Sequence, residues 1–89
     1  AHSGELNFQV RDTPATLTKL DEIYAAKASA RSTLDGLRFE FRDTNLPKQD
    51  WWFNVRASNT EPVLRLNLEA RTQSQMEARK LELTDILRA

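Results

Sequence analysis

The chain of 89 residues contains no cysteine and only two glycines, and its thirteen basic residues are balanced by thirteen acidic ones. Without cysteine there can be no disulfide framework and no thiolate metal site, which is compatible with a reducing, cytoplasmic setting. A net charge of zero argues against a nucleic-acid partner held by general attraction to the phosphate backbone. No apolar run approaches the ~20 residues that a membrane-spanning helix needs, so we expect no membrane partner.

The size of the chain, 10.2 kDa, allows one modest hydrophobic core. We therefore expect a single domain over residues 1–89. The sequence opens without a methionine and runs almost directly into a strand pattern, which suggests a piece of a longer protein.

Four segments alternate apolar and polar residues with the period of two that is typical of a strand with one buried face. They cover residues 5–11, 37–41, 51–57 and 63–70. A further short strand over residues 32–34 is expected before a two-residue hairpin turn at Asp35 and Gly36. When the four segments are aligned, one face carries Leu6, Phe8, Val10, Leu37, Phe39, Phe41, Phe53, Val55, Leu64, Leu66 and Leu68.

Two segments show helical spacing of their apolar residues. The first covers about residues 14–30, with Thr13 as the expected cap and Pro14 in the first turn. The second begins with a capping box of Ser74 and Glu77 and continues to the end of the chain. The order β-α-β-β-β-β-α predicts an α+β open-faced sandwich similar to that of the TATA-box-binding protein. Its mostly antiparallel sheet has two helices on one face and a polar opposite face.

The turn from Arg56 to Pro62 joins the last two alternating segments and combines residue types that suit phosphate binding. A guanidinium offers a rigid fork of donors to a phosphate. Ser58, Asn59 and Thr60 can add side-chain donors, and successive backbone N–H groups of a turn can form an anion-binding concavity. The alternative is an ordinary polar hairpin connection, because Ser, Asn and Pro are common turn residues.

Arg65 lies on the polar face just after this turn, where it adds positive charge near a phosphate or pairs with Glu69 or Glu40. No pair of carboxylates has the spacing that acid–base catalysis would need, and no constellation of metal ligands is evident. We therefore assign no catalytic residue and no metal ligand to this chain.

With these elements in place, the chain resembles the C-terminal, fourth domain of the α-D-phosphohexomutases, specifically their phosphomannomutase/phosphoglucomutase branch. The resemblance rests on residues 4–8, on residues 35–38 and above all on residues 52–70. In that family the Arg-x-Ser-Asn-Thr-x-Pro turn binds the phosphate of the substrate. The resemblance thus implies this role for Arg56, Ser58, Asn59 and Thr60. Phosphoglucosamine mutases are similar but typically carry Gly at the position of Asn59, so they are the second choice.

The resemblance also implies what a full enzyme would do. Such an enzyme interconverts hexose 6-phosphate and hexose 1-phosphate through a phosphoserine, a hexose bisphosphate intermediate and a magnesium ion. Those parts belong to three preceding domains, which would be the partners of this one. The chain by itself holds no cofactor and is expected to be inactive.

A different class of function is a non-enzymatic module that recruits protein or single-stranded RNA on its polar sheet face. RNA readers of similar architecture stack bases on aromatic side chains of the sheet, and the alternation leaves only Trp52 exposed on that face.

Overall fold

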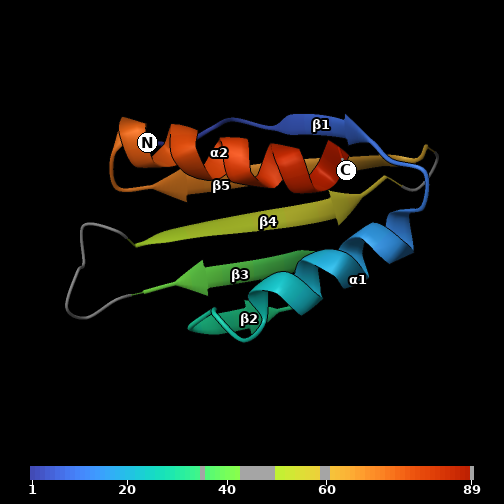
Figure 1. Ribbon diagram of the computed structural model, residues 1–89, viewed down its shortest axis with the longest axis horizontal. Helices are drawn as coiled ribbons and strands as arrows, with labels where there is room; N and C mark the ends of the chain where they lie inside the picture. Colours follow the sequence, from blue (N-terminus) through green and yellow to red (C-terminus); the bar gives the residue numbers. More distant parts are fainter. Residues whose placement is uncertain (35, 43–49, 59–60, 89) are drawn as a thin grey trace.

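A computed structural model describes residues 1–34, 36–42, 50–58 and 61–88 of the chain (Figure 1). The elements follow the predicted order of strands and helices. They are β1 (Leu6–Gln9), α1 (Thr13–Tyr24), β2 (Ala30–Ser32), β3 (Leu37–Phe41), β4 (Trp51–Ala57), β5 (Val63–Ala70) and α2 (Gln73–Arg88).

The strands form one five-stranded sheet in the order β1-β5-β4-β3-β2. Every neighbouring pair is antiparallel. Both helices lie on the same face of the sheet, with α2 over β5 and α1 over β3 (Figure 1). The predicted α+β open-faced sandwich is therefore confirmed, and β1 enters the sheet beside β5 rather than beside its neighbour in sequence.

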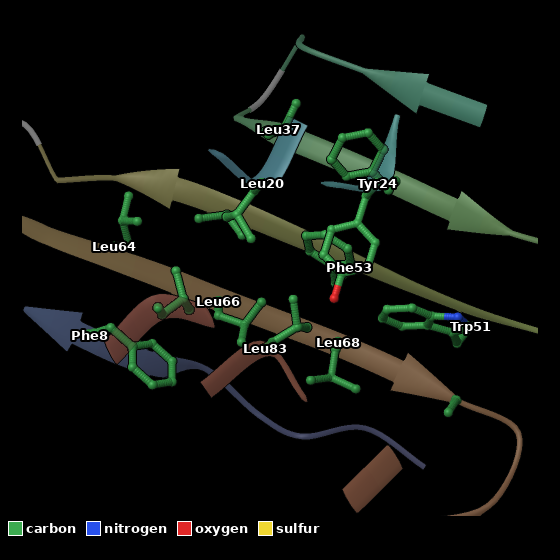
Figure 2. Close-up of a cluster of buried hydrophobic side chains, with 14 of the residues drawn as sticks. Phe8, Leu20, Tyr24, Leu37, Trp51, Phe53, Leu64, Leu66, Leu68 and Leu83 are labelled. Atoms are coloured by element: carbon green, nitrogen blue, oxygen red, sulfur yellow. The ribbon is translucent and has the colours of Figure 1, made fainter. Parts of the chain in front are cut away.

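The hydrophobic core fills the space between the sheet and the two helices. Leu64, Leu66 and Leu68 line one face of β5, and Leu83 of α2 lies beside Leu66 and Leu68 (Figure 2). The buried residues are Phe8, Leu20, Tyr24, Leu37, Phe39, Trp51, Phe53, Val55, Leu64, Leu66, Leu68, Ala70, Met76, Leu83 and Leu87, and Leu6, Val10 and Phe41 pack partly buried against them. The apolar face expected from the alternation is thus the core face.

Both helices begin with a different cap from the one expected. Asp12, not Thr13, caps α1, because its Oδ1 accepts the N–H of Ala15 at 3.0 Å. Thr72, not Ser74, caps α2, since its Oγ1 accepts the N–H of Gln75 at 3.1 Å. In each case a second residue able to cap lies within two positions along the chain, and the sequence pattern alone does not choose between such neighbours.

The first helix ends at Tyr24, six residues before its expected end. The chain leaves the helix because residues 30–32 pair with β3 as an edge strand, and sheet pairing overrides the weak preference of Ala-rich sequence for helix. Asp21 of α1 holds Arg31 of β2 through two contacts of 2.7 and 2.9 Å. The guanidinium lowers the pKa of Asp21 by this pairing, so α1 is tied to the edge strand.

The hairpin between β2 and β3 also differs from its expected form. A two-residue turn at Asp35 and Gly36 would pair Leu34 with Leu37, whereas Ser32 pairs with Arg38. The strands are therefore β2 at 30–32, not 32–34, and four residues separate them. Asp35 lies outside the described residues, while Gly36 has the positive φ of 81° that a tight turn there requires.

Tyr24 is the polar member of the core. Its ring makes an edge-on contact with Phe53 at 5.0 Å between ring centres, and its hydroxyl donates a hydrogen bond to the Glu82 carboxylate of α2. Burial raises the pKa of the Tyr24 hydroxyl far above its ordinary value of 10.0, and the bond to Glu82 adds to this effect. The folded chain therefore keeps the proton in solutions where the unfolded chain loses it.

We expect the free energy of unfolding to fall as the pH rises above 10.0, the ordinary pKa of tyrosine. Over that range the unfolded chain binds fewer protons than the folded one, so stability declines by up to about 1.4 kcal/mol per pH unit. Urea unfolding at a series of alkaline pH values measures this slope. Tyr24→Phe is the control, because it removes the only tyrosine and leaves every lysine in place. Equal slopes in the two proteins would refute the assignment to Tyr24.

Candidate functional site

Four strands contribute to the end of the sheet where the predicted phosphate turn lies. β4 and β1 end there, while β3 and β5 begin there (Figure 1). The ladder places Arg56 of β4 opposite Arg65 of β5, and Arg65 opposite Asn7 of β1. Residues that are far apart in the sequence therefore come together on the polar face beside the turn.

Arg56 and Arg65 form a cross-strand pair of like charges on the polar face. Both residues are exposed. Like charges directly opposite one another in a sheet repel. An anion placed between or beside the two guanidinium groups would offset the repulsion, and a phosphate can accept hydrogen bonds from both.

Two adjoining hollows open on this face. The hollow of about 510 Å³ at the β1 side is lined by Glu5, Asn7, Gln9, Ser58, Glu61, Val63 and Arg65. The neighbouring hollow of about 460 Å³ is lined by His2, Ser32, Leu34, Arg38, Trp52, Asn54, Arg56 and Asn67. Ser58 and Arg65 thus share one hollow, while Arg56, which is paired with Arg65 in the β4–β5 ladder, lines the other. The first hollow also contains two carboxylates, which limit where an anion can sit.

The backbone N–H of Ser58 is used within the hairpin rather than offered to an anion. The N–H of Ser58 donates to the Val63 carbonyl at 3.0 Å, and the N–H of Val63 donates to the Glu61 carbonyl at 2.8 Å. The first bond extends the β4–β5 ladder by one residue, the second is a local bond within the turn, and both donors are thus used internally. For Ser58 the expectation of an amide aimed at an anion is wrong, because the ladder extends one residue into the turn. The side chain of Ser58 is half-buried at the rim of the hollow.

Asn59 and Thr60, the other two predicted phosphate ligands, lie outside the described residues. Their part in the site stays a prediction.

The alternative expected for Arg65 was an ion pair with Glu69 or Glu40. Within the described ranges Arg65 makes no such pair, and Glu40 instead lies 3.3 Å from Arg38 and 3.7 Å from Arg42. Arg38 and Glu40 occupy β3, two strands away from β5. Arg65 therefore contributes positive charge next to Arg56 that no described carboxylate pairs with.

Three residues at this end of the sheet lie beside the candidate site although the sequence alone did not indicate it. Asn7 and Gln9 lie on the polar face of β1 and line the hollow beside Arg65. Their alternation marks them as polar-face residues, but only the pairing of β1 with β5 brings them to Arg65. Gly36 was expected to serve the hairpin alone, yet it lies against the side chain of Arg56.

We also searched the described residues for a metal site and for a membrane-spanning helix. There, no three side chains of His, Asp or Glu group together in a way that could hold a metal ion. No helix among the same residues is long and apolar enough to cross a membrane.

The fold and the arginine pair together define an α+β sandwich domain with a candidate anion site at one end of its sheet. Comparison with known families gives a more specific result. The chain belongs to the phosphoglucomutase/phosphomannomutase C-terminal domain family, whose model matches residues 5–86. The resemblance drawn from the residues of the turn is thereby confirmed.

Curated relatives share this part of their sequence with the chain. A phosphomannomutase of Salmonella montevideo is 40% identical over 86 residues, which cover 96% of this chain and 17% of the relative. A phosphomannomutase of Methanocaldococcus jannaschii is 37% identical over 97% of this chain and 17% of its own length. A protein of Xanthomonas campestris named phosphohexose mutases is 37% identical over 97% of the chain and 18% of its own length. The chain thus spans less than a fifth of the length of these relatives.

Proposed function

We propose that this chain is the domain that binds the substrate phosphate in a phosphohexomutase of the phosphomannomutase/phosphoglucomutase branch. That enzyme would interconvert hexose 6-phosphate and hexose 1-phosphate. The observation that carries the proposal is the cross-strand pair of Arg56 and Arg65 beside Ser58, on a chain of this family. Names of the relatives support the branch, and the exposed pair of guanidinium groups supports an anionic ligand.

The proposed role is positioning rather than chemistry. In an isomerisation of this kind the sugar binds in two orientations, with either C1 or C6 at the reacting group, and the phosphate that does not react is common to both. Arg56 and Arg65 would hold that phosphate by charge and by hydrogen bonds, with Ser58, Asn59 and Thr60 adding donors. Binding energy from this remote group then places the reacting oxygen, which lowers the barrier to transfer.

The rest of the enzyme would come from other domains of a longer chain, packed against residues 1–89. They would supply the phosphoserine and the ligands of Mg²⁺, which assists phosphoryl transfer when it is bound. The carboxylates and the imidazole in the described part of this chain do not group as such a site requires. We therefore place none of the metal ligands here, and we expect the chain alone to have no mutase activity. A cytoplasmic location would suit its phosphorylated substrates.

The alternative of an RNA-binding module meets a physical obstacle at Trp52. The guanidinium of Arg38 lies 4.2 Å from the centre of its ring, and the ring of His2 lies 5.9 Å away. A base would have to displace Arg38 to stack on that face. Phosphoglucosamine mutase remains the second choice within the family, since its substrate presents the same phosphate and the branches differ at Asn59.

Titration of the chain with glucose 1-phosphate, followed by amide NMR, tests the proposal directly. We expect the shifts to concentrate on residues 56–60 and on Arg65, with a Kd near millimolar, because a single partial site contributes about 4 kcal/mol. Glucose without the phosphate is the matched control and should leave these signals unchanged. Equal shifts with both ligands, or shifts elsewhere on the sheet, would refute phosphate binding at this turn.

A further inference from the structure

Gly36 makes an unusually close approach to the residue that carries the proposed function. It immediately precedes β3, and a Cβ atom built on it would lie 2.5 Å from Cγ of Arg56 and 2.5 Å from the carbonyl oxygen of Val55. Carbon atoms that are not bonded sit about 3.5–4.0 Å apart at their best separation. Any side chain at position 36 would therefore displace Arg56 or the strand that bears it.

The positive φ of Gly36 would by itself explain a glycine, so the close approach has to be separated from it. The other glycine of the chain makes this possible. Gly4 has a similar φ of 72°, but a Cβ atom there would meet nothing within 4 Å. The two glycines share the backbone requirement and differ in what lies next to them.

Arg56 has neighbours on both sides within the sheet. On one side the start of β3 with Gly36 lies against its stem, and on the other side Arg65 of β5 stands opposite. An atom added at Gly36 would push the stem of Arg56 toward Arg65, whose like charge opposes that movement, or away from the sheet. Either movement turns the guanidinium fork.

We propose that Gly36 is a positioning residue for phosphate binding. Because it lacks a side chain, the stem of Arg56 can lie against the start of β3, and this contact sets the direction of the guanidinium. The inference rests on the proposed function of Arg56. A fork that binds phosphate through two parallel hydrogen bonds tolerates only small errors of place and angle, so the direction of the stem matters for affinity.

The test compares Gly36→Ala with Gly4→Ala in the full-length enzyme. Both variants carry the strain of a side chain at positive φ, but only the first crowds Arg56. We expect Gly36→Ala to raise KM for the hexose phosphate by roughly 10- to 100-fold. We expect Gly4→Ala to change KM by less than about twofold, and the melting temperature of each variant reports its cost to folding.

A double-mutant cycle separates positioning from general damage to the fold. Arg56→Ala removes the Cγ atom, so adding Gly36→Ala to it should leave KM where Arg56→Ala alone put it. The contact with the Val55 carbonyl persists in the double variant, so its loss of thermal stability should persist too. If Gly36→Ala multiplies KM equally in both backgrounds, the positioning role is wrong.

The remaining outcomes distinguish this inference from the proposed function. A raised KM in Arg56→Ala together with a normal KM in Gly36→Ala would overturn the inference alone. An unchanged KM in Arg56→Ala would overturn the proposed function, and the inference with it. Should Gly36→Ala fail to fold, Gly36→Asn supplies the same crowding atom on a residue that tolerates positive φ, and the same rise in KM is expected.

Discussion

Replacing Arg56 by alanine in the full-length enzyme is expected to raise KM for the hexose phosphate by between roughly 30-fold and several thousand-fold. Removing one partner of a charged hydrogen-bonded pair costs about 2–5 kcal/mol, and each 1.4 kcal/mol is a factor of ten in affinity. Arg56→Lys should fall between the two proteins, because lysine keeps the charge but loses the planar fork. Steady-state kinetics with the hexose phosphate as the varied substrate measures the effect.

Arg71 provides the matched control for this experiment. It is an exposed arginine just after β5, at the opposite end of the sheet, where its Nη2 lies 3.8 Å from Oδ2 of Asp50. Arg71→Ala removes the same charge from the domain but leaves the proposed site unchanged, so its KM should stay near that of the parent. Similar rises in both variants would mean that the total charge of the domain matters and that Arg56 has no specific role.

Replacing Phe53 by alanine is expected to destabilise the domain by about 3–5 kcal/mol. The Phe53 side chain is fully buried in the middle of the sheet. Its ring centre lies 5.0 Å from that of Tyr24, 5.4 Å from that of Phe39 and 5.5 Å from that of Trp51. Alanine would leave a cavity among these rings, and the loss is a large share of the roughly 5–15 kcal/mol that stabilises a typical domain. Chemical denaturation of the chain measures it.

Leu81→Ala is the control for Phe53→Ala. Leu81 lies on α2 away from the core and is 68% exposed, so its truncation should change the free energy of unfolding by less than about 0.5 kcal/mol. A loss below about 1 kcal/mol in Phe53→Ala would show that the aromatic cluster does not govern the stability of this sheet.

Much of the core follows directly from local patterns in the sequence. The alternation in residues 51–57 and 63–70 predicts two strands and identifies Phe53, Val55 and Leu66 as buried, which they are. A side chain on a strand points to one face or the other with a period of two, so burial can be assigned before any neighbour is known. Helical spacing identifies Leu20 and Leu83 in the same way.

Some residues of the candidate site can be recognised from the local sequence, and others only from the pairing of distant strands. Arg56 and Ser58 are recognisable because a guanidinium and hydroxyls in one turn suit a phosphate, whatever surrounds them. Asn7 and Gln9 become relevant only because β1 pairs with β5, more than fifty residues along the chain. The ladder bond from Ser58 to Val63 also depends on how far the strands pair into the turn, and no local pattern reports that distance.

The ends of the helices likewise depend on both local sequence and contacts with distant residues. The sequence contains two suitable caps near each helix start, and the structure shows that Asp12 and Thr72 are the ones that accept the first free N–H groups. Residues 25–30 have enough alanine to continue α1. The helix nevertheless ends at Tyr24, and Ala30 and Arg31 pair with β3 at the edge of the sheet. Competition between two locally acceptable structures is settled by contacts with distant residues.

The sequence by itself determined the kinds of element, the face of each that is buried and the family, and it located the turn proposed to bind phosphate, since these depend on residue type and short spacing. Only the tertiary structure decided that Arg65 faces Arg56, that β1 lies against β5 and that Gly36 crowds the stem of Arg56. The physical reason is that pairing order and register depend on the summed packing of the whole core, whereas each side-chain pattern reports only its own segment.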